Sequence, residues 1–67
     1  MDKYIVLYTN HCWTVGDNPF GFRCHAENGD HAEEQCIETE PNADVVWVVQ
    51  TDDYEAALRD YYNNWEL

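Results

Sequence analysis

The stretch Tyr4 to Thr9, which reads Tyr-Ile-Val-Leu-Tyr-Thr, decides the fold of this chain. Its residues are mostly β-branched or aromatic, and apolar side chains fall on both of its alternating faces. A strand with two apolar faces is typical of the centre of a sheet that is covered on both sides. We therefore expect residues 4–9 to form the central strand of a small sheet.

Two more strands are expected on the C-terminal side of this stretch. From Phe20 to Glu27 apolar and polar residues alternate, which predicts a strand buried on one face. Residues 10–19 end in Gly-Asp-Asn-Pro, a cluster of turn-forming residues, and are expected to form a surface loop. Asp44 to Gln50 is a nearly continuous apolar run of strand length, which predicts the third strand.

Two helices are expected to follow the second and third strands. Asp30 and Glu33 have the spacing of a capping box, which predicts a helix that begins there and ends near Glu38. Asp52 and Glu55 repeat that spacing, and apolar residues then recur at helical intervals. The apolar stripe of this last helix consists of Tyr54, Ala57, Leu58, Tyr61 and Trp65.

The order of these elements predicts an α+β fold, a single ββαβα domain over residues 1–67. A helix between two strands is typical of a right-handed crossover, so the second and third strands should run parallel with the first between them. We thus expect a three-stranded mixed sheet of order 2-1-3 with both helices on one face. The other face would be open and apolar, as is typical of an interface. Its candidate residues are Tyr4, Tyr8 and Trp47, which could form a homodimer or bind a partner, unless the loop with Trp13 covers them.

The negative charge is concentrated in the second half of the chain. Residues 27–66 carry 12 of the 14 acidic residues and one base, Arg59, so they account for all of the net charge of -11. Such a density opposes folding through self-repulsion, and it favours a positively charged partner. Surfaces that hold nucleic acid are the commonest basic surfaces in a cell, so an acidic decoy for one of them is our leading hypothesis.

A two-row array of carboxylates would give this decoy its geometry. Residues 34 and 38 lie one turn apart on the first helix, about 6 Å at 1.5 Å per residue. If the second helix lies alongside, its carboxylates form the other row. The candidate partner-binding residues are Glu33, Glu34, Glu38, Glu40, Asp52, Asp53, Glu55 and Asp60. The alternative is an ordinary solvated acidic face that serves only solubility.

No residues point to catalysis or to a cofactor. Cys12, Cys24 and Cys36 lack a Cys-x-x-Cys pair, and the His-Cys neighbours on a strand would point to opposite faces, so we expect free thiols and no metal site. Cys24 and Cys36 fall on the predicted core faces. A chain of 67 residues with one layer of helices offers little concavity for an active site. The chain has no basic patch, so direct nucleic-acid binding is not expected.

The chain is expected to act in the cytoplasm. Its longest uninterrupted apolar run, Val45 to Val49, is far shorter than the roughly 20 residues of a membrane helix. The apolar stretch near the N-terminus is too short for a secretory signal and lacks a small-residue cleavage site. We therefore predict no membrane partner.

Several segments resemble small acidic proteins encoded by bacteriophages. They are Phe22-Arg-Cys-His-Ala-Glu, His31-Ala-Glu-Glu-Gln, Pro41 and Val45-Val-Trp-Val, which together cover roughly residues 20–49, and the C-terminal helix is similar too. The resemblance implies an early product that inhibits host machinery, in some cases by imitating DNA and so blocking restriction, gyrase or CRISPR effector complexes. It includes no functional motif, so it assigns no role to any residue.

Overall fold

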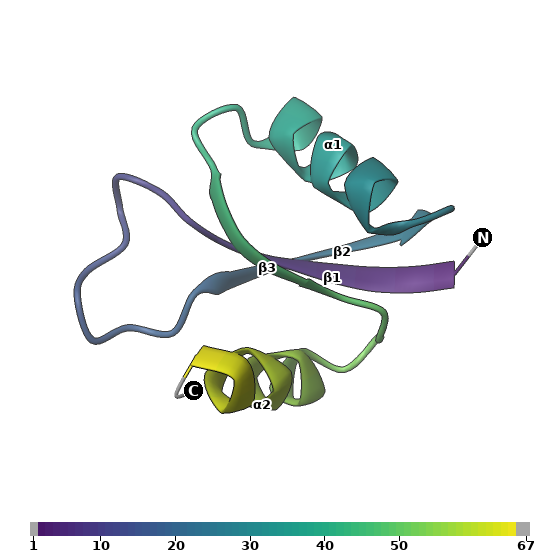
Figure 1. Cartoon of the computed structure of the whole chain (residues 1–67). Coiled ribbons are helices and arrows are strands. Elements are labelled where there is room, and N and C mark those ends of the chain that lie inside the picture. Colours follow the sequence, from purple (N-terminus) through teal and green to yellow (C-terminus); the bar gives the residue numbers. More distant parts are fainter. Residues whose placement is uncertain (1, 66–67) are drawn as a thin grey trace.

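The computed structural model describes residues 2–65, with Trp65 described by its backbone alone. The chain forms two strands, a helix, a third strand and a second helix, which confirms the predicted ββαβα order and the α+β class (Figure 1). The elements are β1 (Asp2–Thr9), β2 (Phe20–Ala26), α1 (Gly29–Thr39), β3 (Asp44–Val49) and α2 (Tyr54–Trp65).

The sheet has the predicted order, β2-β1-β3, with β1 in the centre. Both pairings are antiparallel, so the predicted mixed sheet is wrong in this respect. The strands β2 and β3 run in the same direction, as expected, but β1 lies between them. They therefore do not form a parallel pair, and each pairs only with the antiparallel β1. The β1·β3 register shifts between Leu7 and Tyr8, whose partners are Trp47 and Val45. Val46 is therefore the extra residue of a β-bulge.

The two helices cover opposite faces of the sheet, which corrects the prediction that they share one face (Figure 1). On one face, Val6 packs with Ala32 and Cys36 of α1. On the other face, Ile5 and Leu7 form a cluster with Ala57 of α2. These residues are all fully buried. Because successive side chains of a strand alternate between faces, the two apolar faces of β1 each require a cover, and each helix supplies one.

No open aromatic sheet face exists in the described part of the chain, so the alternative interface predicted from the sequence is wrong. Tyr4 and Tyr8 pack into the cluster beneath α1. Trp47 packs into the cluster beneath α2, where its ring centroid lies 6.2 Å from that of Tyr61. The three aromatic residues thus lie on two different faces, and each is partly buried against the helix on its face.

The helix α1 begins two residues earlier than the predicted capping box. Asn28 is its N-cap, and the Asn28 side chain accepts a 2.9 Å hydrogen bond from the backbone N–H of His31. Asp30 lies within the first turn, where a carboxylate complements the positive end of the helix dipole. Asparagine is as good an N-cap as aspartate, but residue 31 is histidine and not glutamate, so Asn28 lacks the capping-box spacing on which the prediction relied.

The helix α2 begins one residue later than predicted. The Asp53 carboxylate accepts a 3.0 Å hydrogen bond from the backbone N–H of Glu55, so Asp53 rather than Asp52 caps the helix. The predicted apolar stripe is confirmed for the residues that the structure describes, while the side chain of Trp65 lies outside them. Its members in the core are Tyr54, Ala57, Leu58 and Tyr61.

Candidate functional site

The helix α1 and its C-terminal cap carry a one-sided acidic surface. Its five carboxylates, here called the α1 acidic surface, belong to Asp30, Glu33, Glu34, Glu38 and Glu40. All are exposed except Glu33, which is half-buried. The chain contains no lysine or arginine from residue 24 to residue 58, so neither residue type neutralises the surface from within this segment. An exposed apolar side chain, Ile37 at 44% exposure, lies on the same helix.

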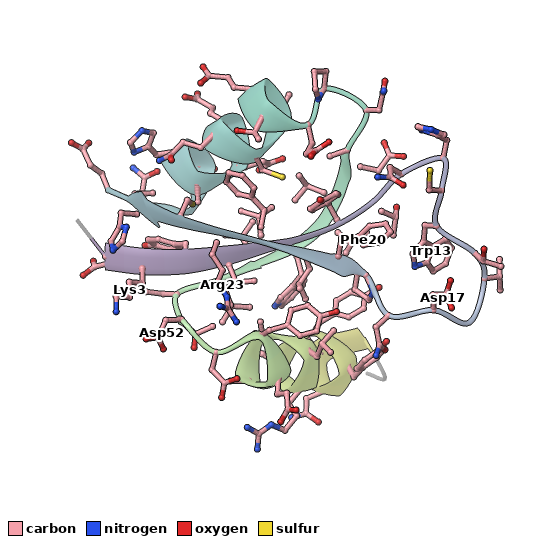
Figure 2. The ribbon with its side chains drawn as sticks, turned by 180° about the vertical axis from the view of Figure 1, so that it is seen from behind. Lys3, Trp13, Asp17, Phe20, Arg23 and Asp52 are labelled. Atoms are coloured by element: carbon pink, nitrogen blue, oxygen red, sulfur yellow. The ribbon has the colours of Figure 1, made fainter. Side chains whose placement is uncertain are left out.

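The bases of the chain lie on the other side of the sheet. Arg23 of β2 is opposite Ile5, whose side chain is in the α2 cluster, so Arg23 shares that face. Lys3 lies 3.4 Å from the Asp52 carboxylate, and Figure 2 shows Lys3, Arg23 and Asp52 together at one end of the sheet. Arg59 belongs to α2 itself. The sheet therefore separates a layer without lysine or arginine from a layer of mixed charge.

The predicted two-row array does not form, because the sheet lies between the two helices. The eight predicted residues divide into two sets of four, one on each side. Glu33, Glu34, Glu38 and Glu40 belong to the α1 side, while Asp52, Asp53, Glu55 and Asp60 belong to the α2 side.

Three of the α2-side carboxylates already have partners within the chain. Asp52 lies beside Lys3, and Asp53 caps α2. Asp60 accepts a 2.7 Å hydrogen bond from the indole Nε1 of Trp47. These contacts partly occupy the α2-side groups, so the α1 acidic surface is the more available of the two sets.

The thiol of Cys36 reports the electrostatic environment beneath α1. Burial is the main factor that raises the pKa of this thiol to about 11, with smaller contributions from Cys24, Glu40 and Glu33. Burial likewise raises the pKa of the Tyr8 hydroxyl, and the negative charge of Glu40 adds to the effect. Both groups stay protonated at neutral pH, so the core beneath α1 contains no additional charge.

Cys24, Cys36 and His31 have structural roles. Cys24 and Cys36 lie in the α1 cluster, which confirms their predicted core placement, and both are free thiols, as is the exposed Cys12. The ring Nδ1 of His31 accepts a 3.2 Å hydrogen bond from the backbone N–H of Glu27. In the described residues, no group of three or more His, Cys, Asp and Glu side chains is placed to hold a metal ion. The hydrogen bond between Glu27 and His31 instead helps to fix the turn that leads into α1.

Residues 10–19 form a loop, as predicted. This loop is one wall of a cavity that the sequence did not indicate. The cavity has a volume of about 550 Å³ and lies between the loop, β3 and α2. The indole Nε1 of Trp13 donates a 3.1 Å hydrogen bond to the Asp17 carbonyl, and Figure 2 shows both residues in this loop. The hydroxyl of Tyr62 donates a 2.6 Å hydrogen bond to Asn18. The only sequence signal for this site is a tryptophan within a loop of turn-forming residues.

Comparison with known proteins identifies no family for this chain. No protein-family model matches it, and no curated protein or solved structure matches it significantly. Neither α1 nor α2, the helices of the described residues, is long and apolar enough to cross a membrane.

Proposed function

We propose that this chain acts by binding, without catalysis, and that its α1 acidic surface occupies a basic surface on a protein that handles nucleic acid. The observation that supports this proposal is the separation of charge between the two helical layers. Five carboxylates lie on α1 and its cap, whereas Lys3, Arg23 and Arg59 all lie on the opposite side. A solubility device does not require such segregation, because mixed charges spread over the surface would serve equally well.

The spacing of the carboxylates suits a basic groove. Glu34 and Glu38 lie one helical turn apart, about 6 Å along the axis. A groove that binds the phosphates of one nucleic-acid strand presents lysine and arginine side chains to such a row of charges. The exposed side chain of Ile37 would add apolar contact area next to them. The α2-side carboxylates would contribute long-range attraction and speed the encounter.

The resemblance to small acidic bacteriophage proteins narrows the proposed partner. It favours a bacterial host protein, such as a restriction enzyme, gyrase or a CRISPR effector complex, whose nucleic-acid site the chain would block in the host cytoplasm. Inhibition would be competitive with nucleic acid, because both ligands would use the same lysine and arginine side chains.

Charge reversal on the two sides of the sheet tests this proposal. Glu34→Lys/Glu38→Lys reverses two charges of the α1 acidic surface. Asp17→Lys/Glu55→Lys changes the net charge by the same amount at exposed positions away from α1. Each tagged variant is incubated with nuclease-treated bacterial lysate and washed at low and at high salt, and retained proteins are identified by mass spectrometry. A retained protein is then purified, and its association rate with the chain is measured as a function of salt.

The proposal predicts a nucleic-acid-binding protein that the unaltered chain and the Asp17→Lys/Glu55→Lys variant retain at low salt. Glu34→Lys/Glu38→Lys should lose it, high salt should release it, and duplex DNA should compete for it. Retention that is insensitive to salt, or an equal loss in the two double variants, would contradict the proposal. Circular dichroism of each variant establishes that it remains folded.

A further inference from the structure

The strand β3 is an edge of the sheet. One side of β3 pairs with β1, and no strand in the described residues 2–65 pairs with its other side (Figure 1). Its sequence, Asp-Val-Val-Trp-Val-Val, has no lysine or proline, which are the residues that usually block edge pairing. The other edge strand is blunted, because β2 carries Arg23 and His25, and Gln35 of α1 donates a 2.7 Å hydrogen bond to the His25 carbonyl. The edge available for pairing is therefore that of β3.

Two cavities on the α2 side of the sheet are lined in part by residues of β3. Val46 is the extra residue of the β-bulge, and both Val46 and Trp47 pack on the α2 side. A cavity of about 390 Å³ lies next to them, lined by Val46, Trp47, Tyr61 and Asn64. The larger cavity beneath the loop is also lined by Val46 and Tyr61. An edge strand with adjacent pockets is the arrangement by which proteins bind an extended peptide, since its backbone pairs with the edge and alternate side chains fill the pockets.

The charges around β3 select a basic occupant. The Asp60 carboxylate accepts the hydrogen bond of the Trp47 indole, and Trp47 is one of the residues that line the smaller cavity. Asp44, which is exposed, begins the strand. The rings of Trp47 and Tyr61 offer aromatic surface on which a guanidinium group can stack. An arginine side chain therefore satisfies both the carboxylate and the rings.

We propose that the outer edge of β3 binds an extended segment of another protein as a fourth strand, with an arginine of that segment in the pocket lined by Trp47 and Tyr61. A second copy of this chain fits less well, because each copy has a net charge of -11 and would bring the same carboxylates together. This edge lies apart from the α1 acidic surface, so the inference does not depend on the proposed function.

A designed peptide tests the inference by nuclear magnetic resonance. The probe is acetyl-Thr-Arg-Val-Arg-Val-Arg-Thr-amide, in which arginine would face α2 and valine would face α1. There are two control peptides. In the first, glutamate replaces every arginine, and in the second, every second backbone nitrogen is methylated. Chemical shifts and amide hydrogen exchange of the ¹⁵N-labelled chain are followed for β3 and for the Trp47 indole. The same titration is repeated with Asp60→Asn, which keeps an acceptor for the indole but removes the charge, and with Glu34→Lys/Glu38→Lys.

The expected result is a set of shifts confined to β3 and the pocket. At a peptide concentration ten times the Kd, exchange of the newly bonded β3 amides should slow by about tenfold. Asp60→Asn should weaken binding by about two- to fivefold, as for an exposed ion pair. Glu34→Lys/Glu38→Lys should not change the peptide-induced shifts on β3. That result would show that this site is separate from the α1 acidic surface. Neither control peptide should slow the exchange.

Three results would overturn the inference. The first is the absence of β3 shifts at millimolar peptide, and the second is equal binding of the glutamate peptide. The third is protection of β3 in the peptide-free chain that rises with protein concentration, together with a dimeric mass in sedimentation, because a second copy would then be the occupant.

Discussion

Tyr54 of α2 lies directly over Gly21 of β2. A Cβ atom at residue 21 would come within 2.5 Å of the Cδ1 atom of the Tyr54 ring, which is closer than real Cβ contacts allow. The hydroxyl of the same tyrosine donates a short hydrogen bond to the Pro19 carbonyl, and burial raises the pKa of that hydroxyl. The absence of a side chain at residue 21 thus allows α2 to pack closely on this face.

Gly21→Ala should destabilise the fold because the added methyl group has no space. We expect the free energy of unfolding to fall by about 1–3 kcal/mol, as for other overpacked sites. Urea denaturation followed by circular dichroism measures this change. Gly29→Ala is the matched control, because the nearest atom to its new Cβ would be Val48 Cγ1 at an ordinary 3.6 Å, and it should not destabilise the fold.

A double-mutant cycle tests whether Tyr54 is the cause. In a Tyr54→Ala background the ring is absent, so Gly21→Ala should cost clearly less than it does in the unaltered chain. An equal cost in both backgrounds would mean that the glycine is needed for another reason.

Asn28→Ala should destabilise α1 by removing its cap. The lost acceptor for the His31 N–H should lower the free energy of unfolding by about 1 kcal/mol, a typical value for a helix cap. Asp30→Ala removes only a favourable charge in the first turn and should cost a few tenths of a kcal/mol. Thermal and urea unfolding of the two variants provide the comparison. A larger loss of stability in Asp30→Ala than in Asn28→Ala would show that Asp30 is the N-cap, as the sequence predicted.

The raised pKa of Cys36 makes stability depend on alkaline pH. Since the folded-state pKa is about 11 and the ordinary value is 9.0, the unfolded chain loses this proton first as pH rises. The contribution is fully present below pH 9 and is lost progressively towards pH 11. Tyr8 and Tyr54, whose pKa values burial also raises, act in the same direction above pH 10.

Urea unfolding between pH 8 and pH 11.5 measures this dependence. The Cys36→Ala variant should be less stable at pH 8 because of the lost packing, but its stability should fall less steeply between pH 9 and pH 11. Alkylation provides a second readout, because exposed Cys12 should react with iodoacetamide well before Cys36 does. A variant with an unchanged pH slope would show that Cys36 does not titrate in this range.

The secondary structure and the sheet order followed from local sequence patterns. The two apolar faces of Tyr4 to Thr9 predicted a central strand, and β1 occupies that place. The helical spacing of Tyr54, Ala57 and Leu58 predicted one packed face for α2, and those residues are in its core. Such patterns are readable because each strand and helix buries the side chains that its own periodicity brings together.

The face on which each helix packs was not readable in this way. An apolar stripe indicates that a helix packs on a sheet but does not name the face, and the short connection Gln50 to Asp53 permits either one. The apolar residues on both sides of β1 contained the signal, since an uncovered apolar face would remain in water. The predicted aromatic interface through Tyr4, Tyr8 and Trp47 was wrong for this reason.

The sequence by itself determined the composition of the candidate site: the run without lysine or arginine from residue 24 to residue 58 places acidic side chains on α1 whatever the fold. Tertiary structure alone decided which carboxylates share a surface, because grouping depends on which face of the sheet each helix covers. It also decided that β3 is an edge beside a pocket lined by Trp47 and Tyr61. Contacts between residues far apart in the chain depend on the packing of whole elements, and local periodicity cannot specify that packing.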